Sequence, residues 1–279
     1  MELWKALILG IVQGASEYLP ISSSGHLAIF REILGVDLPA SQELQFDVMV
    51  HFATVLSTVV ILWPMFRKLC AGFFRFNGNP DFIYVCKVLV SCIPVGIVGV
   101  FFKDYVEDIF GQGLGVVGCC LIVTALLLAF AYYSGFDRRT GRPVPADKGR
   151  TIGWGDAFII GCAQAVAVLP GLSRSGSTIA TGILLGDKRG QVATFSFIMV
   201  ILPIVGESLL DLAKMISTPA AAAAEPTSAI GAGAMLTGFA AAFLVGCAAC
   251  KWMIELVKRG KLIWFAVYCA AAGLLCLLW

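Results

Sequence analysis

Long apolar stretches separated by short polar segments run along the chain, and they predict an all-α integral membrane protein. A membrane-spanning helix needs roughly 20 consecutive apolar residues. Six stretches come close to this length, so we expect six transmembrane helices. They are Leu44–Phe66, Phe82–Phe102, Leu114–Tyr133, Val192–Ala213, Ile230–Cys250 and Leu262–Trp279.

Two further apolar stretches are interrupted in the middle. Leu3–Leu34 contains Pro20 and several polar residues, and Ala157–Leu185 contains Pro170 and a second polar group. Each pattern is typical of two half-length helices joined by a polar turn, which is a re-entrant hairpin. Non-helical backbone at membrane depth is stable only where it is buried in protein or lines water. We therefore expect both turns to lie inside the protein.

The two interrupted stretches resemble each other. Gln164 lies 151 residues after Gln13, and Ser173 lies 151 residues after Ser22. The same offset relates Gly10 to Gly161, Ser24 to Ser175, and Gly25 to Gly176. Each half therefore consists of a hairpin followed by three spans. We predict a single membrane domain, residues 1–279, with one repeat at 1–135 and a second at 152–279.

The number of membrane crossings determines how the two repeats are oriented relative to each other. A hairpin returns to the side it entered, and three spans then leave the chain on the opposite side. An internal repeat of this kind is inverted in topology, and its two polar turns can meet near the middle of the membrane. The sequence therefore predicts six transmembrane helices plus two re-entrant hairpins in an inverted repeat.

Composition agrees with a membrane protein. The chain is 59% hydrophobic and 14% charged, whereas soluble domains are roughly half apolar and about a quarter charged. The net charge is only +2. No basic stripe is present that could neutralise a nucleic-acid backbone, so nucleic acid is not an expected partner.

Basic loop residues predict the orientation, because cytoplasmic loops are enriched in Lys and Arg. In the alternating count, four basic groups fall on one side, which we therefore expect to be cytoplasmic. They are Arg67, Lys68 and Arg75; Arg138, Arg139, Arg142, Lys148 and Arg150; Lys188 and Arg189; and Lys251, Lys258, Arg259 and Lys261. Both termini are then predicted outside, together with a flexible loop at Pro219–Ser228.

Ionisable residues inside the membrane are costly and point to function. Glu17, His26 and Arg174 are the clearest cases, and Asp47 and His51 are weaker ones. Gln13 and Glu17 are four residues apart and share a helix face. They could hold a divalent cation, or Glu17 could orient a histidine. The alternative is a buried polar pair that only hydrogen-bonds the second repeat.

The serines of the first turn, Ser22 to Ser24, follow a proline and precede Gly25-His26. One of them is expected to cap the second half-helix. The N–H groups of a helix N-terminus also suit a phosphate. Ser23 and His26 are three residues apart, so both can face one pocket as nucleophile and base. His26 could instead be a packed polar residue.

The second turn contributes one guanidinium, that of Arg174. This arginine has no acidic partner in its own segment. A buried arginine needs an anion, and its fork geometry fits phosphate oxygens. The alternative partner is Glu17, in an ion pair that joins the two repeats. Both pairings can alternate with ligand occupancy.

These residues carry a resemblance to a known family. The segment 13–26, QGASEYLPISSSGH, resembles the (E/Q)xxxE…PxSSxGH motif of bacterial undecaprenyl-diphosphatases of the bacitracin-resistance type. Residues 170–178, PGLSRSGST, resemble that family's PGxSRSGxT motif. Length, span count and span order agree along the whole chain. Gln13 stands where many members have Glu, which weakens a metal role at that position.

The resemblance implies a reaction and a place. The reaction is hydrolysis of undecaprenyl diphosphate to undecaprenyl phosphate and phosphate at the outer, periplasmic face of the bacterial inner membrane. It recycles the lipid carrier for peptidoglycan synthesis. A divalent cation, Mg²⁺ or Ca²⁺, is implied as well, with Glu17 and Gln13 as its expected ligands.

The resemblance also implies roles for individual residues. Ser23 is the expected nucleophile, His26 the base and then acid, and Arg174 the group that stabilises the transferring phosphoryl. Glu17 holds the metal or orients His26. Water activated by His26 is the alternative nucleophile. The expected hydrogen-bond donors to the diphosphate are Ser22, Ser24, Ser173, Ser175 and Thr178.

A transporter is the main competing function, because inverted repeats with broken helices are also a transporter architecture. A flippase for undecaprenyl phosphate would use Arg174 and the helix ends but would not need Ser23 and His26. A channel is not supported, because no ring of like charges appears. The pattern permits a homodimer without requiring one.

Overall fold

The computed structural model describes residues 1–102, 105, 109, 113–135, 144–145, 148–217 and 230–278. The side chains of residues 40, 207 and 211–217 are not described. The predicted external loop at 219–228 and the basic residues Arg138, Arg139 and Arg142 lie outside the described residues. Throughout the described part of the chain the secondary structure is helical, with one isolated bridge and no strand. The predicted all-α class is confirmed.

Five helical segments are long and apolar enough to cross a membrane. They are Ser41–Ile61, Pro80–Phe101, Leu114–Ser134, Arg189–Leu210 and Ala232–Lys258. The first, third and fifth correspond to α3 (Ala40–Ile61), α7 (Leu114–Ser134) and α12 (Ala232–Lys258), and the second is α5 (Pro80–Phe101). The chain is therefore a multi-pass membrane protein. The remaining predicted span is α13 (Ile263–Leu278), which is also apolar but has only 16 residues.

Prolines interrupt two of the predicted spans. The predicted span Leu44–Phe66 ends earlier, at Ile61, and a separate helix α4 (Trp63–Phe73) follows, with Pro64 in its first turn. The fourth span consists of α10 (Arg189–Met199) and α11 (Ile201–Ser217), with Pro203 in the first turn of α11. Proline lacks an N–H and clashes with the carbonyl four residues earlier, so each helix is interrupted just before it.

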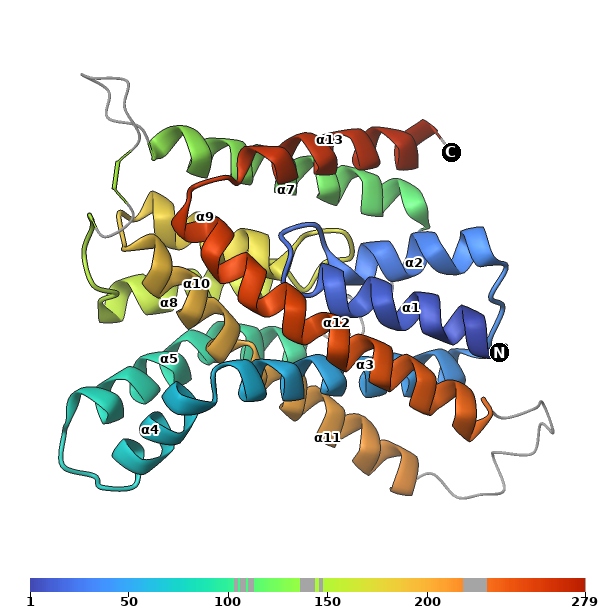
Figure 1. Ribbon diagram of the computed structural model, residues 1–279, viewed down its shortest axis with the longest axis horizontal. Coiled ribbons are helices and arrows are strands. Elements are labelled where there is room, and N and C mark those ends of the chain that lie inside the picture. The colour runs from blue at the N-terminus through green and yellow to red at the C-terminus, as the bar shows by residue number, and fades with distance from the viewer. Residues whose placement is uncertain are drawn as a thin grey trace.

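Two helical hairpins point into the bundle from opposite ends. The first is α1 (Leu3–Ser16) with α2 (Ser23–Leu34), and the second is α8 (Trp154–Val166) with α9 (Arg174–Leu184). Their turns meet near the middle of the molecule (Figure 1). The chain termini lie at one end, and α4, the start of α10 and the end of α12 lie at the other. The helix ends that carry the described basic loop residues thus gather at one end of the bundle.

Small residues let the inner hairpin helices pack closely on long helices. A Cβ atom on Gly10 of α1 would lie 2.3 Å from the Gly238 carbonyl oxygen of α12. A Cβ atom on Gly161 of α8 would lie 2.3 Å from the Ser91 carbonyl oxygen of α5. Contacts of this kind between small residues are typical of membrane helices. They fix the depth at which each hairpin presents its turn.

Candidate active site

The first turn runs from the end of α1 to the start of α2 and is shaped by Ser22. This residue is the N-cap of α2, and its hydroxyl accepts a hydrogen bond from the Gly25 N–H at 3.3 Å. The expected serine cap is therefore Ser22. Its φ of +72° is unusual for a residue with a side chain. Backbone strain of this kind concentrates at functional sites, where the surrounding structure holds it in place.

The second turn has the same construction. Ser173 is the N-cap of α9, and its hydroxyl accepts from the Gly176 N–H at 3.0 Å. The Ser173 N–H donates to Thr124 Oγ1 of α7 at 3.0 Å. Gly171 has a φ of +88°, and a Cβ there would lie 2.4 Å from the Val117 carbonyl oxygen. The turn is thus pressed against α7, which holds it at a fixed depth.

Direct contacts join the two turns. Arg174, the first residue of α9, places Nη2 3.3 Å from Glu17 Oε1. Ser175 Oγ donates to the Leu19 carbonyl at 3.1 Å. The predicted meeting of the two turns is observed, and the Glu17–Arg174 ion pair that the sequence offered as an alternative is formed here.

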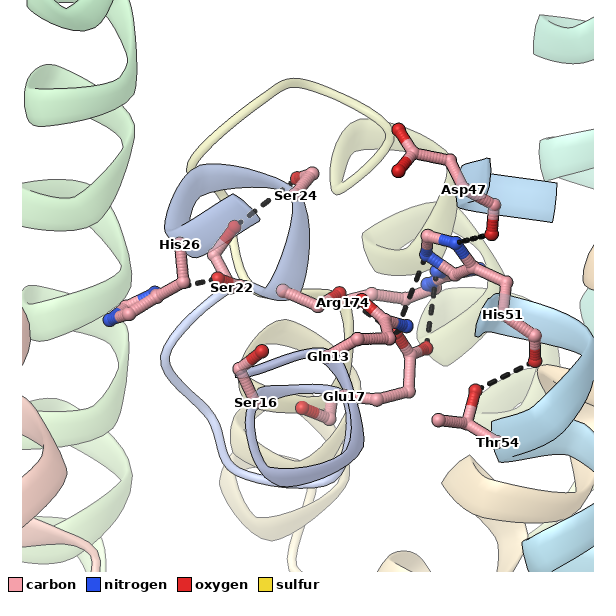
Figure 2. A network of polar contacts seen from close by, with 12 residues as sticks. Gln13, Ser16, Glu17, Ser22, Ser24, His26, Asp47, His51, Thr54 and Arg174 are labelled. Carbon is pink, nitrogen blue, oxygen red and sulfur yellow. Dashed lines mark hydrogen bonds and ion pairs between the residues drawn. The ribbon is translucent and has the colours of Figure 1, made fainter. Parts of the chain in front are cut away.

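Glu17 is the centre of a polar cluster (Figure 2), and its side chain is 7% exposed. Its Oε2 accepts from Ser23 Oγ at 2.7 Å and from Gln13 Nε2 at 3.0 Å. His51 Nε2 lies 3.6 Å from the same oxygen. A hydroxyl bonded to a carboxylate beside a guanidinium is chemically equipped for phosphoryl transfer, because the carboxylate can accept the hydroxyl proton.

His51 comes from α3 and was only a weak candidate from the sequence. Its Nδ1 lies 2.8 Å from the Asp47 carbonyl oxygen. A carbonyl oxygen only accepts, so Nδ1 carries a proton, and the other ring nitrogen, Nε2, is directed elsewhere. That nitrogen faces Glu17. The sequence signal was an ionisable residue in a predicted span, but it did not show which face of α3 meets the turn.

The turn is fastened to α3 by Tyr18. Its hydroxyl lies 2.5 Å from the Thr54 carbonyl oxygen, 2.5 Å from Ser57 Oγ and 2.8 Å from Thr58 Oγ1. The tyrosine is almost fully buried. Because Glu17 directly precedes Tyr18, this anchor holds the carboxylate beside His51.

His26 does not join this cluster. Figure 2 shows it pointing away from Glu17. Its Nδ1 lies 2.8 Å from the Ser22 carbonyl oxygen, and its Nε2 lies 2.7 Å from the Tyr268 hydroxyl of α13. The two rings are stacked, with centroids 5.5 Å apart. Both ring nitrogens are thus occupied, as in the packed-polar reading of this histidine.

The remaining predicted substrate donors lie around the two turns. Ser24 Oγ is 3.4 Å from Ser22 Oγ, and Ser175 Oγ is 3.4 Å from Ser173 Oγ. Thr178 donates its hydroxyl to the Arg174 carbonyl at 2.9 Å. A cavity of about 20 Å³ lies beside Glu17 and Arg174. A cavity of this size holds about one water and is too small for a diphosphate in this conformation.

The arrangement of Gln13 and Glu17 does not suit a metal ion. Gln13 turns its amide nitrogen toward Glu17, and its Oε1 is buried without a hydrogen bond to any described residue. Glu17 Oε1 accepts from Arg174, and Oε2 accepts from Ser23 and Gln13. The part of the chain that the structure describes holds no group of three His, Cys, Asp or Glu residues able to bind a metal. These two residues alone therefore do not form a metal site.

A serine hydroxyl bonded to a carboxylate beside a guanidinium, set among membrane-spanning helices, is the arrangement expected of a membrane-embedded phosphatase. Comparison with known proteins gives the particular family. The profile of the bacitracin resistance protein BacA family matches residues 6–275. The chain belongs to this family.

Named relatives cover nearly the whole chain. It is 55% identical over 273 residues to an undecaprenyl-diphosphatase of Bacteroides fragilis, covering 98% of this chain and 96% of the relative. It is 54% identical over 274 residues to one of Parabacteroides distasonis, with 98% and 97% covered. A more distant undecaprenyl-diphosphatase, of Oceanobacillus iheyensis, is 34% identical over 278 residues, with 97% and 94% covered. The family expected from the two motifs is confirmed.

Proposed function

We propose that this protein hydrolyses undecaprenyl diphosphate to undecaprenyl phosphate and inorganic phosphate. The relatives at 54–55% identity carry that activity in their names. The single observation that carries the mechanism is the 2.7 Å hydrogen bond from Ser23 Oγ to Glu17 Oε2, with Arg174 on the other carboxylate oxygen.

Ser23 is the proposed nucleophile. Its Oγ attacks the terminal phosphorus while its proton passes to Glu17 Oε2, and undecaprenyl phosphate leaves with the bridging oxygen. Glu17 is re-ionised as its proton passes to His51. Water then attacks the phosphoserine and gives a proton to Glu17, the bond between phosphorus and Ser23 Oγ breaks as Oγ takes that proton from Glu17, and inorganic phosphate leaves. In the alternative, water activated in the same place attacks the lipid diphosphate directly. Acid quenching during turnover, followed by peptide mass spectrometry, separates the two: phosphoserine at Ser23 is expected only in the first.

Arg174 changes partner during this cycle. In the absence of substrate it neutralises the Glu17 carboxylate. When the diphosphate enters, its guanidinium turns to the phosphate oxygens, which its fork of donors fits. Glu17 then loses its counter-charge at the moment it must accept a proton. His51 Nε2 is placed to receive that proton from Glu17 in turn.

For His26, a role in positioning the first turn replaces the predicted role as base. We propose that it holds the first turn in shape, because it links the Ser22 carbonyl to Tyr268 of α13. His26→Ala should therefore lower the thermal stability together with activity. His51→Ala should lower activity and shift its pH profile while leaving stability closer to wild type. The opposite pattern would restore His26 as the base.

The way in which the chain crosses the membrane is also part of this proposal. We infer that α13 is the sixth span, that both hairpins are re-entrant, and that the two halves are inverted repeats. The opposite directions of the hairpins and the gathering of basic loop residues at one end support this (Figure 1). With the basic end in the cytoplasm, the termini lie outside and the site opens to the periplasmic side. A C-terminal epitope tag should then be labelled from outside intact spheroplasts.

The decisive experiment is phosphate release from undecaprenyl diphosphate by purified protein in detergent. Ser23→Ala and Arg174→Ala should each lower the rate by at least about 100-fold, as the loss of a nucleophile or a charge-stabilising donor does. A chelator series tests the predicted need for Mg²⁺ or Ca²⁺. No release by well-folded wild type with metal present would reject the phosphatase.

Transport of undecaprenyl phosphate is the second candidate, favoured by hairpin turns that meet from opposite ends of the bundle. Ser23→Ala in vesicles separates the two functions. A flippase would still move the monophosphate across the bilayer in this variant, whereas a phosphatase would lose its product. Retained transport together with normal hydrolysis in wild type would assign both functions to one chain.

A further inference from the structure

A second cavity lies at the basic end of the bundle, away from the Glu17 cluster. Its volume is about 310 Å³. Its wall is formed where α7 and α12 end and where α10 and α13 begin, at the end of the molecule opposite the chain termini (Figure 1). Three cationic residues line it, namely Arg189, Arg259 and Lys261.

The guanidinium of Arg189 is built into this cavity. Its Nη2 donates to the Gly135 carbonyl at 3.0 Å. A Cβ on Gly135 would lie 2.0 Å from Nη2, and one on Gly260 would lie 2.4 Å from Nη1. Two glycines thus bracket the guanidinium, and any other residue at either position would push it aside. Among the described residues Arg189 has no carboxylate partner, so no described carboxylate neutralises this half-buried charge.

The rest of the lining adds positive charge and an apolar edge. Arg259 pairs with Glu255 at 3.1 Å, but both side chains are more than half exposed, which makes this a weak pair. Lys261 forms no ion pair with a described carboxylate. Ile263 and Trp264 also line the cavity, and Trp264 is 71% exposed. Tryptophan at a helix end in a membrane protein is typical of the headgroup level of the bilayer.

We propose that this cavity binds the phosphate of an anionic membrane lipid, at a site separate from the one that hydrolyses the diphosphate. Basic pockets between membrane helices on the cytoplasmic side bind lipid phosphates in this way. Loop arginines that only direct topology need neither a cavity nor glycines that bracket the side chain. The apolar wall and the exposed tryptophan favour a lipid over free phosphate, because a lipid brings acyl chains to the same edge.

The test uses full-length protein in detergent and native mass spectrometry with didecanoyl phosphatidate. Didecanoyl phosphatidylcholine and inorganic phosphate are the comparison ligands. Phosphatidate should bind more tightly than phosphatidylcholine. The double variant Arg259→Gln/Lys261→Gln should bind it at least about tenfold more weakly, since each basic residue near a lipid headgroup is worth roughly fivefold in affinity. Both residues are exposed, so the variant should fold.

The matched control removes the same charge from another part of the basic end. Arg67→Gln/Arg75→Gln, at exposed positions on α4 and just after it, should leave phosphatidate binding within about twofold. An equal loss in the control would show general surface attraction and overturn the proposal. Displacement of the lipid by millimolar inorganic phosphate would reassign the cavity to free phosphate. Hydrolysis should be unchanged in both double variants, so failure here is distinguishable from failure of the phosphatase.

Discussion

The two hairpins have nearly the same backbone plan but carry different chemistry. Ser23 begins α2 and Arg174 begins α9, and the two positions are 151 residues apart, the offset that relates the halves. The same offset matches Glu17 with Val168. One turn therefore supplies a hydroxyl and a carboxylate, and the other supplies the guanidinium.

This comparison shows how a repeated structure can become a site with divided roles. Equivalent N-caps, Ser22 and Ser173, shape both turns. Equivalent close contacts, at Gly10 and Gly161, set the depth of both hairpins. The scaffold is shared, whereas the groups that react are not. Changes at paired positions should therefore separate what belongs to the scaffold from what belongs to the chemistry.

The largest effect on activity is expected at Glu17, where the two hairpin turns differ most in chemistry. Glu17→Gln keeps an oxygen for the Ser23 hydroxyl but cannot take its proton. The rate of phosphate release should fall by about 10²–10⁴, the usual contribution of a general base. Val168→Ala, the matched change in the other turn, should leave the rate within a few fold. A wild-type rate in Glu17→Gln would remove Glu17 from the proton-transfer step.

The next effect tests the shared scaffold. Gly10→Ala and Gly161→Ala should each destabilise the protein by about 1–3 kcal/mol, because a Cβ at either position overlaps a backbone oxygen. Thermal unfolding in detergent measures this. Gly155→Ala on α8, where a Cβ meets open space, is the control and should be neutral or slightly stabilising. Unequal losses at Gly10 and Gly161 would show that the two halves do not share this packing.

Substitution by leucine should have different effects at the paired glutamines, Gln13 and Gln164. Gln13 donates to Glu17, whereas neither amide atom of Gln164 hydrogen-bonds to a described residue, because Val168 replaces the carboxylate. Gln164→Leu should stabilise the protein by about 1–3 kcal/mol, which is the cost of an unsatisfied buried polar group. Gln13→Leu should instead lower activity, since it removes a donor to Glu17. A destabilised Gln164→Leu would indicate that this amide has a partner such as a buried water.

The smallest expected effect is on the pH dependence of stability, and it concerns the residues that follow the two hairpins. Gly35 and Gly186 end them with positive φ, and the next residues are Val36 and Asp187. Asp187 is 3% exposed, and its oxygens hydrogen-bond to no described residue. Burial and the neighbouring Asp156 raise the pKa of Asp187 to about 6, against the opposing effects of Arg150 and Lys87.

This raised pKa gives stability a definite pH dependence. The folded protein binds the Asp187 proton more tightly than the unfolded chain, so stability is lost as the pH rises through about 6. Lowering the pH from 7.5 to 5.5 should therefore raise the melting temperature. Asp187→Asn should flatten this part of the profile and stabilise the protein at pH 7.5. A steeper profile in the variant would contradict the assignment.

Much of the framework could be predicted from the pattern of residues. The two hairpins, the serine caps and the meeting of the turns follow from apolar periodicity, prolines and an internal repeat, all of which are local signals. The sequence also offered Arg174 and Glu17 as partners. Several span boundaries were wrong by three residues or more. Pro64 ends the first span before Phe66, the fourth span begins at Arg189 and not at Val192, and the fifth continues past Cys250 to Lys258.

The amino-acid sequence by itself determined which polar residues stand in the two hairpin turns and which family the protein belongs to. Only the tertiary structure decided which of them face one another. Ser23 and His26 are three residues apart and could have shared a pocket, but Ser23 turns to Glu17 and His26 turns to Tyr268, 242 residues later. His51 takes the place beside the carboxylate. Spacing fixes a face of one helix, whereas the neighbour of that face is set by how distant helices pack.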